Sequence, residues 1–544
     1  MEQMDMRRKV IVILAVMFAL LFAALNQTII GTALPRIVAD LGGMEIFNWV
    51  FTAFMLASVI STVLTGKLSD IYGRKPFILI GIIIFIIGTF LCGLSQSMIQ
   101  LIVFRTVQGF GAGIIISLAF ASVGDLFEPR ERGRWQGLMG SVYGVASVFG
   151  PTLGGYIVDH NDWHWIFWVF LPLGAIALAL IWVLYPSVGK AERQPIDYVG
   201  SLFFAALIVP LLLAFSWAGS RYSWGSAPIL GLFAASALAL ALFVAAERKA
   251  ANPVMPLSLF RSGAFVISNS IGFMTGAGMF GTIMYAPFFI QGVTGTSPTA
   301  AGFVMMTFNV SLVLAGAIVG NLITRTGRYK IFGLCGVLIM AAGMLLMALM
   351  DTGTTNAEIA FYLVVTGFGL GIGMNVYLVT VQNAVENRML GVATASVQLF
   401  RQLGGTFGVA VMGTVMNVRM AGHIRELAAA QGGATEELAP EAREAFAGLA
   451  NPQTLMDPAQ IDAARSRIPE EMQDFFAQTV LALREALSDS LTSAFMLGAL
   501  IVFCGFVLGF FLKEVPLRTS RRPAAHEEHQ KHPVPGRERS LPGN

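Results

Sequence analysis

The stretch from Gly66 to Pro76 reads Gly-Lys-Leu-Ser-Asp-Ile-Tyr-Gly-Arg-Lys-Pro and separates two long apolar runs. Its skeleton, G-x-L-x-x-x-x-G-R, occurs again from Gly320 to Arg328, also between apolar runs. Further matches keep nearly the same offset: Arg134 and Gly137 with Arg388 and Gly391, Gly150 and Gly154 with Gly404 and Gly408, and a V-x-G-F-G-x-G string at Val107–Gly113 and Val365–Gly371. This ordered series predicts two halves built on one plan and joined head to tail.

Composition sets the class of protein. Hydrophobic residues make up 56% of the chain, charged residues only 12%, and the mean hydropathy is +0.71. A water-soluble domain of this length does not carry so apolar a composition, so the sequence indicates a polytopic membrane protein. Cys92, Cys335 and Cys504 all lie in apolar runs without C-x-x-C spacing. We therefore expect no disulfide framework, metal site or cofactor.

Apolar runs of about 20 residues, the length that crosses a bilayer, follow one another along the chain. The first follows Arg7, Arg8 and Lys9 but is too long for a signal peptide and has no small-residue cleavage site, so we expect it to stay attached. Fourteen spans are predicted, at 10–32, 46–66, 77–96, 99–123, 135–157, 164–185, 199–219, 228–247, 264–291, 299–323, 330–350, 357–383, 393–417 and 491–512.

The distribution of basic residues predicts the orientation. The N-terminus and the six alternate short connectors carry 18 Lys and Arg residues, whereas the opposite short connectors carry only Arg36 and Arg221. Because Lys and Arg accumulate on the cytoplasmic side, both termini are predicted to face the cytoplasm. The connectors at Gly66–Pro76 and Gly320–Lys330 then both lie on that side.

The repeat also divides the chain into segments. The matching elements lie in spans two to five and ten to thirteen, so spans seven and eight fall between two six-helix bundles, as packing helices or with a function of their own. The polar segment after span thirteen is predicted to be extracytoplasmic, with a lid or docking role as the alternative. The segments expected are an N-terminal bundle (1–190), two inserted helices (191–255), five helices of the C-terminal bundle (256–418), the loop (419–490), the last helix (491–512) and a disordered cytoplasmic tail (513–544).

Several motifs together resemble one family of transporters. Gly66–Pro76 is similar to the signature between the second and third helices of the major facilitator superfamily, and Arg105–Gly113 to its arginine motif in the fourth helix. Gly140–Gly155 resembles the fifth-helix motif of its antiporters. With Leu25–Pro35, Trp163–Phe167 and Arg401–Gly405, these stretches resemble the fourteen-span drug:proton antiporters. The resemblance implies an all-α fold of two six-helix bundles plus two inserted helices.

The charged connector has its own physical interpretation. Asp70 lies close to a helix end and is placed to accept from the N-terminal amides of a neighbouring helix, while Arg74 and Lys75 hold the loop at the cytoplasmic surface. Asp125, near the end of span four, is a candidate partner for Arg74. We predict a conformational latch formed by Asp70, Gly73, Arg74, Lys75 and Asp125; the alternative is a static role in topology.

The antiporter motif is a series of small residues in span five. Gly140 with Gly144, and Gly150 with Gly154, present faces that permit close helix contact. We expect this face to slide against a helix of the other bundle, with Gly404 and Gly408 of span thirteen as the matching surface. The motif positions are Gly140, Gly144, Gly150, Pro151, Gly154 and Gly155.

Arg105 is a guanidinium well inside a span, which is costly unless it finds partners or water. Asn26 and Gln27 of span one lie at a similar depth, so we expect Arg105 to bond to span one, with Gln108 one turn along its own helix. Two roles are open, a structural clamp and a direct part in substrate or proton coupling. Arg401 in span thirteen is a second polar position, for which a structural role is favoured.

The resemblance implies exchange for protons, but the expected carboxylate is absent. The family pattern commonly has an Asp at the position of Asn26, and an amide does not take up a proton. Asp125 and Glu386, both near the cytoplasmic surface, are the candidates for coupling.

A substrate cavity is expected between the bundles. Met and aromatic side chains suit loosely specified apolar ligands because they repack at small cost, although the same residues are also ordinary in lipid-facing positions. The cavity candidates are Asn269, Met279, Met284, Tyr285, Phe288, Met305 and Asn309.

No G-x-x-x-x-G-K-[ST] string and no constellation of nucleophile, base and metal occurs in the sequence, so an ATP-driven pump or an enzyme is disfavoured. The prediction is a secondary active exporter of hydrophobic or amphiphilic drugs across the cell membrane, with protons as the exchanged ion and no nucleic-acid partner. A dedicated exporter of one antibiotic, metabolite or lipid, a proton-independent facilitator, an importer and a non-transporting sensor are the alternatives.

Overall fold

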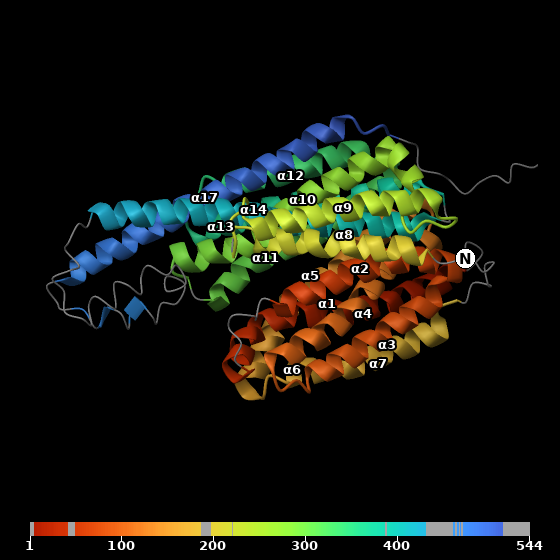
Figure 1. The fold of residues 1–544 in the computed structure, drawn as a ribbon, viewed down its shortest axis with the longest axis horizontal. Helices are drawn as coiled ribbons and strands as arrows, with labels where there is room; N and C mark the ends of the chain where they lie inside the picture. The colour runs from red at the N-terminus through yellow and green to blue at the C-terminus, as the bar shows by residue number, and fades with distance from the viewer. Residues whose placement is uncertain are drawn as a thin grey trace, which may run out of the picture.

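A computed structural model describes residues 5–41, 49–186, 197–219, 221–296, 298–386, 389–430, 461–462, 465–466, 468 and 472–514. Long helices account for most of these residues (Figure 1). Most of the predicted extracytoplasmic loop, and the predicted disordered tail beyond residue 514, lie outside the described residues.

The first half of the chain forms one helical bundle, coloured red to orange in Figure 1. Each apolar run of the sequence becomes a helix, and the short connectors between runs become turns. Its helices are α1 (Met6–Leu41), α2 (Trp49–Tyr72), α3 (Arg74–Cys92), α4 (Met98–Leu126), α5 (Pro129–His160), α6 (Trp165–Trp168) and α7 (Leu171–Leu184).

The second half forms a bundle with its own buried apolar core. It lies beside the first bundle, closest to it at the end where the N-terminus lies, and the two diverge toward the opposite end (Figure 1). Its elements are the short 3₁₀ helix η1 (Leu257–Arg261), α10 (Gly263–Phe288), the π-helical turn η2 (Phe289–Val293), α11 (Pro298–Thr326), α12 (Lys330–Met347), α13 (Asn356–Ala384), α14 (Leu390–Ala430) and α17 (Gln473–Phe510).

Polar side chains define where several helices begin. Ser97 accepts a hydrogen bond from the Gln100 amide at the start of α4, and Thr355 with Glu358 forms a capping box at the start of α13. Such caps satisfy backbone donors that have no partner inside the helix. In a membrane protein they fix the depth at which each span begins, because unpaired amides are not tolerated in lipid.

The two inserted helices, α8 (Tyr198–Trp217) and α9 (Ala227–Lys249), pack on each other, and α8 contacts both α2 and α14. The rings of Trp49 and Trp217 lie 6.0 Å apart, and the Trp224 indole donates to Thr414 Oγ1 at 2.8 Å. The inserted pair therefore covers a seam between the two bundles, which fits the packing interpretation.

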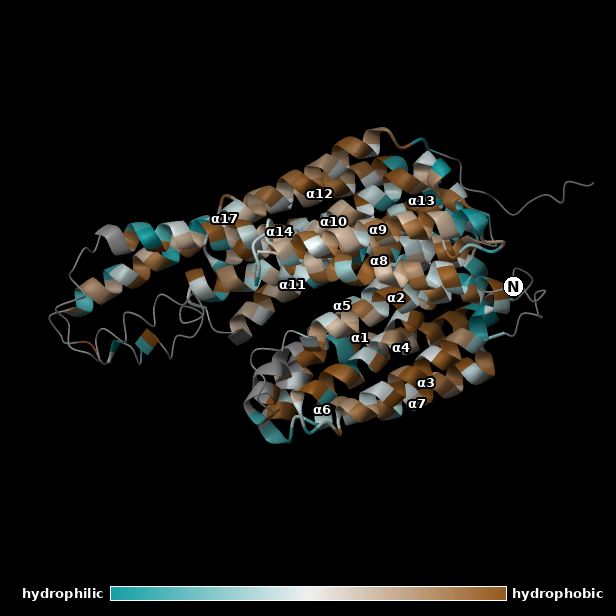
Figure 2. Ribbon diagram, in the orientation of Figure 1, coloured by the Kyte–Doolittle hydropathy of each residue, from teal (hydrophilic) through white to brown (hydrophobic). Residues whose placement is uncertain are grey.

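Within the described residues, twelve helices are long and apolar enough to cross a membrane. The long helices α5 and α14 are not among these twelve, and both lie where the bundles meet. Brown, hydrophobic ribbon dominates the middle of the molecule in Figure 2, as expected for a multi-pass membrane protein. The count of fourteen spans stays a prediction.

The helices flanking the polar segment are longer than predicted. α14 has 41 residues and α17 has 38, whereas about 20 residues cross a bilayer. The extra turns of α17 precede its apolar part and bury Phe476, Val480 and Leu483. This amphipathic stretch therefore continues directly into the last span.

Candidate functional site

Asp70, near the end of α2, binds the beginning of α14 in the other bundle. Its Oδ1 accepts from the Gly391 amide and its Oδ2 from the Val392 amide, both at 3.1 Å. The first amides of a helix carry partial positive charge and lack partners within the helix, so a carboxylate is stabilised there. The predicted contact of Asp70 with a neighbouring helix N-terminus is confirmed, and it joins residues more than 300 positions apart.

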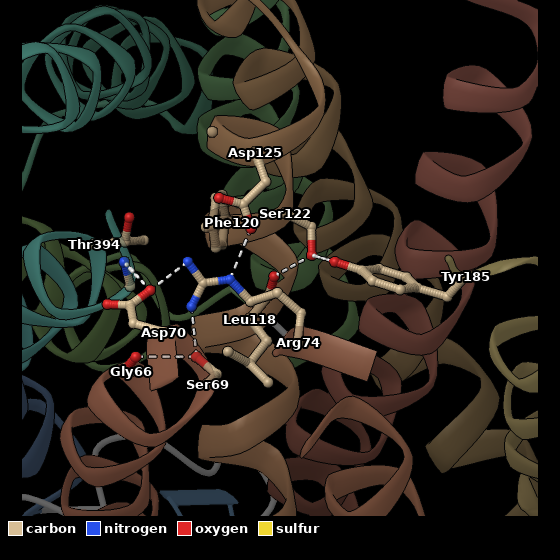
Figure 3. A network of polar contacts seen from close by, with 12 residues as sticks. Gly66, Ser69, Asp70, Arg74, Leu118, Phe120, Ser122, Asp125, Tyr185 and Thr394 are labelled. Carbon is tan, nitrogen blue, oxygen red and sulfur yellow. Dashed lines mark hydrogen bonds and ion pairs between the residues drawn. The ribbon is translucent and has the colours of Figure 1, made fainter. Parts of the chain in front are cut away.

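Arg74, the first residue of α3, holds that carboxylate in place. Its guanidinium lies 2.5 Å from Asp70 Oδ1, donates from Nε to Asp125 Oδ2 at 2.8 Å, and donates from Nη1 to Ser69 Oγ at 2.5 Å. Figure 3 shows the guanidinium between the two carboxylates. A planar fork with several fixed donors suits this geometry, and an ammonium group does not reproduce it. The expected Arg74–Asp125 pair is therefore present.

Gly73 makes the sharp turn between α2 and α3. Its φ of 91° lies in the region that glycine adopts without steric cost, and its amide donates to the Ser69 carbonyl at 3.0 Å. The turn brings Arg74 back over Asp70. Lys75 follows in the first turn of α3 and is half-buried.

A second contact between the bundles is a crossing of α5 and α11 made by glycines. A Cβ atom added at Gly320 would lie 2.3 Å from the Gly133 carbonyl oxygen, and one added at Gly137 would lie 2.7 Å from the Gly316 carbonyl oxygen. Because only glycine permits this approach, the two backbones are in direct contact. The expectation that Gly404 and Gly408 match span five is wrong: they face Phe273 and Ala277 of α10, inside their own bundle.

The antiporter-motif residues divide between different neighbours. Gly144 faces Val313 of α11, in the other bundle, whereas Gly150 faces Thr28 of α1, in its own bundle. Gly140 has no neighbouring atom within 4 Å of an added Cβ, and Gly154 is buried. The surroundings of Pro151 and Gly155 lie outside the described side chains. The single sliding face expected for this motif is therefore wrong for Gly150, because one helix turns different sides to two partners.

A chain of amides also crosses between the bundles. Gln136 Nε2 of α5 donates to Gln382 Oε1 of α13 at 3.5 Å, and Gln382 Nε2 donates to Thr394 Oγ1 of α14 at 3.0 Å. Both glutamines are buried. Neither glutamine was among the predicted site residues, although both are amide side chains inside apolar runs, and that pattern identifies them. They add a polar contact beside the Asp70 cap.

Arg105 is fully buried in the first bundle. It donates from Nη1 to Gln108 Oε1 at 2.5 Å and from Nε to the Val50 carbonyl at 3.4 Å, and its guanidinium lies 4.2 Å from the centre of the Phe54 ring. The predicted direct bond to span one is wrong. Gln108 lies between the two, and its Nε2 donates to Asn26 Oδ1 at 3.4 Å.

Asn26 is buried and donates to the Phe22 carbonyl at 3.1 Å, while Gln27 is half-buried. These contacts tie the polar core to the helices of its own bundle. Of the two carboxylates proposed for coupling, Asp125 is bound to Arg74, and Glu386 lies just beyond the end of α13 with its side chain exposed.

A pocket lies where the two bundles meet, between α4, α5, α11, α13 and α14. Apolar side chains and glycines form most of its wall, with Arg401 as the charged member. Its lining residues are Phe120, Gln136, Gly137, Gly140, Leu312, Val313, Gly316, Gly371, Met374, Asn375, Leu378 and Arg401. A structural role was expected for Arg401. The structure places its side chain in the wall of the pocket between the bundles.

None of the seven cavity candidates lies in the wall of that pocket. Asn269 is buried and donates to the Phe265 carbonyl, Tyr285 donates to the Val409 carbonyl at 2.7 Å, and Met284 is 48% exposed. Met279, Phe288, Met305 and Asn309 are half-buried. The prediction that these residues line the pocket is therefore wrong for this pocket. Met and Phe indicate apolar surface but do not show which helix faces the other bundle.

Comparison with known proteins agrees with this architecture. The family model described as "Major Facilitator Superfamily" matches residues 16–409. The chain belongs to the Major Facilitator Superfamily. As a member of this superfamily it is a membrane transporter and not an enzyme, as the sequence predicted.

Two superfamily relatives from Bacillus subtilis (strain 168) match nearly end to end. Multidrug transporter protein MdtP is 36% identical over 527 residues, which cover 96% of each chain. Multidrug resistance protein 3 is 32% identical over 511 residues, covering 94% of this chain and 96% of the relative. The resemblance inferred from the motifs is therefore confirmed at the level of the superfamily.

Solved structures show the same fold at low sequence identity. The human organic anion transporter MFSD10 aligns with a TM-score of 0.59 at 16% identity, covering 91% of this chain and 99% of that one. A bacterial homologue of the lysosomal transporter Spinster aligns with a TM-score of 0.54, also at 16% identity, covering 94% and 100%. The major facilitator fold is thus shared over more than 90% of this chain.

Proposed function

We propose that this chain is a secondary active efflux transporter that exports hydrophobic and amphiphilic drugs by alternating access, in exchange for protons. The observation that carries the proposal is the cap of α14 by Asp70, since this carboxylate joins the two bundles through bonds that can break and re-form. A transporter of this kind needs such a reversible contact at each side of its substrate site.

The contacts between the bundles gather at one end. The Asp70 cap and the crossing of Gly133 with Gly320 both lie at the end to which α2, α4 and α11 bring their connectors, and the bundles diverge toward the other end (Figure 1). The basic connectors make this end the cytoplasmic one, with both termini on the same side and the protein in the cell membrane. The structure then represents a state that is closed to the cytoplasm.

Loss of charge on Asp70 would weaken this closure. A neutral Asp70 loses its charge-assisted bonds to Arg74 and to the α14 amides, and Arg74 retains only Asp125 as an ionic partner. Proton uptake at the Asp70–Arg74–Asp125 group therefore favours opening toward the cytoplasm. This group supplies the carboxylates for coupling that Asn26 does not supply.

The substrate class follows from the pocket and the relatives. The wall of the pocket is largely apolar, with Phe120, Met374 and Leu378 as its larger side chains. Such surfaces bind by burial of apolar area, without demanding one shape. The relatives named as multidrug proteins support broad export over a single dedicated substrate.

Everted membrane vesicles test the proposal. We expect uptake of an apolar fluorescent dye when the vesicle interior is acidified, and its collapse on addition of an uncoupler. Vesicles with the Arg221→Gln variant, altered at an exposed residue outside the bundle contacts, serve as the matched control. Dye equilibration that ignores the proton gradient would replace the proposal with a facilitator, and no flux at all would reject export.

A further inference from the structure

Five buried or half-buried arginines lie within the described helices of the bundles, and they differ in how their charge is balanced: Arg74, Arg105, Arg132, Arg401 and Arg484. Arg74 contacts two carboxylates, Asp70 and Asp125. Arg105 is fully buried against a carbonyl, an amide and the face of Phe54. Both contact groups that stabilise a cation, and the Nη2 of Arg105 is buried without an acceptor among the described residues. Neither lines the pocket between the bundles.

Arg401 differs from Arg74 and Arg105 because it lines the pocket. Its Nη2 donates to Gln398 Oε1, one turn earlier on the same helix, and its remaining donors have no acceptor within the described residues. Tyr143 of α5 is the titratable side chain close enough to act on its charge. Arg401 is half-buried and lies in the pocket wall. A guanidinium in a pocket wall with donors left over can pair with an anionic group of a ligand.

We propose that this pocket recognises amphiphiles that carry an acidic group, with the Arg401 guanidinium pairing with the carboxylate or a similar anion. The proposal rests on the export function given above and names its preferred substrate class. A guanidinium binds a carboxylate through two parallel N–H···O bonds, which a neutral head group does not match. The apolar wall of Phe120, Leu312 and Met374 then accommodates the hydrophobic body.

The same wall disfavours cations. Among the described residues that line the pocket, Arg401 is the only charged one, so a cationic head group meets a like charge there. Gln136 adds a further preference, because its buried Oε1 has no hydrogen-bond partner in the part of the chain that the structure describes. A hydroxyl or N–H on the ligand, close to its acid group, satisfies that oxygen.

Three probes with one aromatic body and different head groups test the inference: pyrenebutyric acid, its primary amide, and the corresponding trimethylammonium compound. Binding to the full-length protein in lipid nanodiscs is measured by fluorescence anisotropy. We expect the acid to bind roughly 10- to 100-fold more tightly than the amide, the range given by a charged hydrogen-bonded pair, with the cation weakest.

The Arg401→Gln variant should remove the preference for the acid over the amide, while Arg401→Lys should keep part of it because the charge stays and the fork is lost. The ratio of acid to amide affinity within one variant does not depend on how much protein folds. Equal binding of acid and amide to the unaltered protein, or an unchanged ratio in Arg401→Gln, would overturn the inference.

Vesicle transport of the same probes separates this inference from the proposed function. Export of all three probes at similar rates leaves efflux standing and rejects acid selectivity. A preference for the acid in binding, with no export of any probe, supports the pocket and rejects efflux.

Discussion

The two connectors of the internal repeat, Gly66–Pro76 and Gly320–Lys330, have the same backbone design and different chemistry. Gly73 and Gly327 both have positive φ, at 91° and 69°. Gly66 and Gly320 both approach the backbone of a helix in the other bundle, at Gly391 and at Gly133 respectively. The repeat therefore builds two related crossings, α2 with α14 and α5 with α11.

Among the described residues, the carboxylate and the buried ion pairs occur in only the first of them. Thr324 occupies the position of Asp70, and its hydroxyl donates to the Gly320 carbonyl of its own helix at 2.8 Å. Arg328, which matches the buried Arg74, is exposed. The second connector is tied instead to the end of the chain's last helix, since the Tyr329 and Lys330 amides donate to Glu514 Oε1 at 3.0 and 3.4 Å.

The repeat therefore reproduces the helix packing in both halves. The contact that responds to protonation, which we call the switch, occurs, within the described part of the chain, only at the crossing of α2 with α14. The glycines make close crossings in both halves because backbone contact needs no particular charge. The carboxylates and the guanidinium make only the first crossing sensitive to protonation. Substitution of the shared glycines should therefore reduce export in whichever half it is made. Substitution at the position of Asp70 or Arg74 should reduce export only in the first half.

The largest effect is expected from the shared glycines. Gly66→Val and Gly320→Val each force a side chain into backbone atoms less than 3 Å away, so closure at this end becomes sterically blocked. Overpacking of this kind costs about 1–3 kcal/mol, and we expect dye export to fall roughly 10- to 100-fold in both variants.

Gly302→Val, on the same helix as Gly320 and outside the pocket wall, is the matched control, because an added Cβ there meets no atom within 4 Å. The amount of each variant in the membrane is measured by immunoblot and used to normalise export. Normal export in either Val variant would refute the close crossing at that position.

The next effect separates the two halves. Asp70→Asn removes the charge that binds Arg74 and the α14 amides, and we expect export to fall about tenfold, in keeping with the loss of one charge-assisted interaction. Thr324→Val, at the matching position of the second connector, should keep export within about twofold. Initial rates of export in energised vesicles give the comparison. Equal losses in the two variants would show that the switch is not confined to one half.

A smaller effect is expected from a change that keeps charge and loses geometry. Arg74→Lys retains the cation but does not reach Ser69, Asp70 and Asp125 together, so we expect roughly a threefold loss of export. Arg328→Lys, at the exposed equivalent, should have no measurable effect. Resistance of cells to an exported dye, measured by growth, distinguishes them. A neutral Arg74→Lys variant would mean that charge alone, without the fork, is sufficient.

The smallest effect concerns the anchor of the second connector. Glu514→Gln weakens the acceptor for the Tyr329 and Lys330 amides, and we expect the melting temperature of the purified protein to fall by roughly 1–2 °C with export unchanged. A thermal unfolding curve in detergent and the vesicle assay provide both values. Loss of export without loss of stability would assign the second connector a part in the switch.

Much of this comparison could be predicted from the sequence. The G-x-L-x-x-x-x-G-R skeleton predicted two related halves. The position of Asp70 beside a helix end predicted its contact with a helix N-terminus. Apolar length predicted most of the helices within a few residues, because each helix must satisfy its backbone hydrogen bonds inside the membrane, whereas α14 and α17 extend well beyond their predicted spans. These features depend on local sequence and on the bilayer, so no knowledge of tertiary contacts was needed.

The partners across the interface could not be predicted in the same way. Glycine spacing in span five indicated a flat face, but which helix meets it depends on the rotation of both bundles, and α11 rather than α14 lies there. Arg105 was assigned to span one by depth alone, and Gln108 takes the intervening place. The pocket wall combines residues of five helices, and the Met and Phe pattern of α10 carries no information about that arrangement.

The most direct test of a switch confined to the first half is a distance measured across the closed end. Spin labels are placed at two exposed positions, Tyr72→Cys on α2 and Arg328→Cys beyond α11. Cys92, Cys335 and Cys504 are first replaced by serine. The distance between the labels is then measured by pulsed electron–electron double resonance on the protein in nanodiscs. The account predicts one short distance in the unaltered background and in Thr324→Val, and a longer population in Asp70→Asn. The same distribution in Asp70→Asn as in the unaltered background would contradict it.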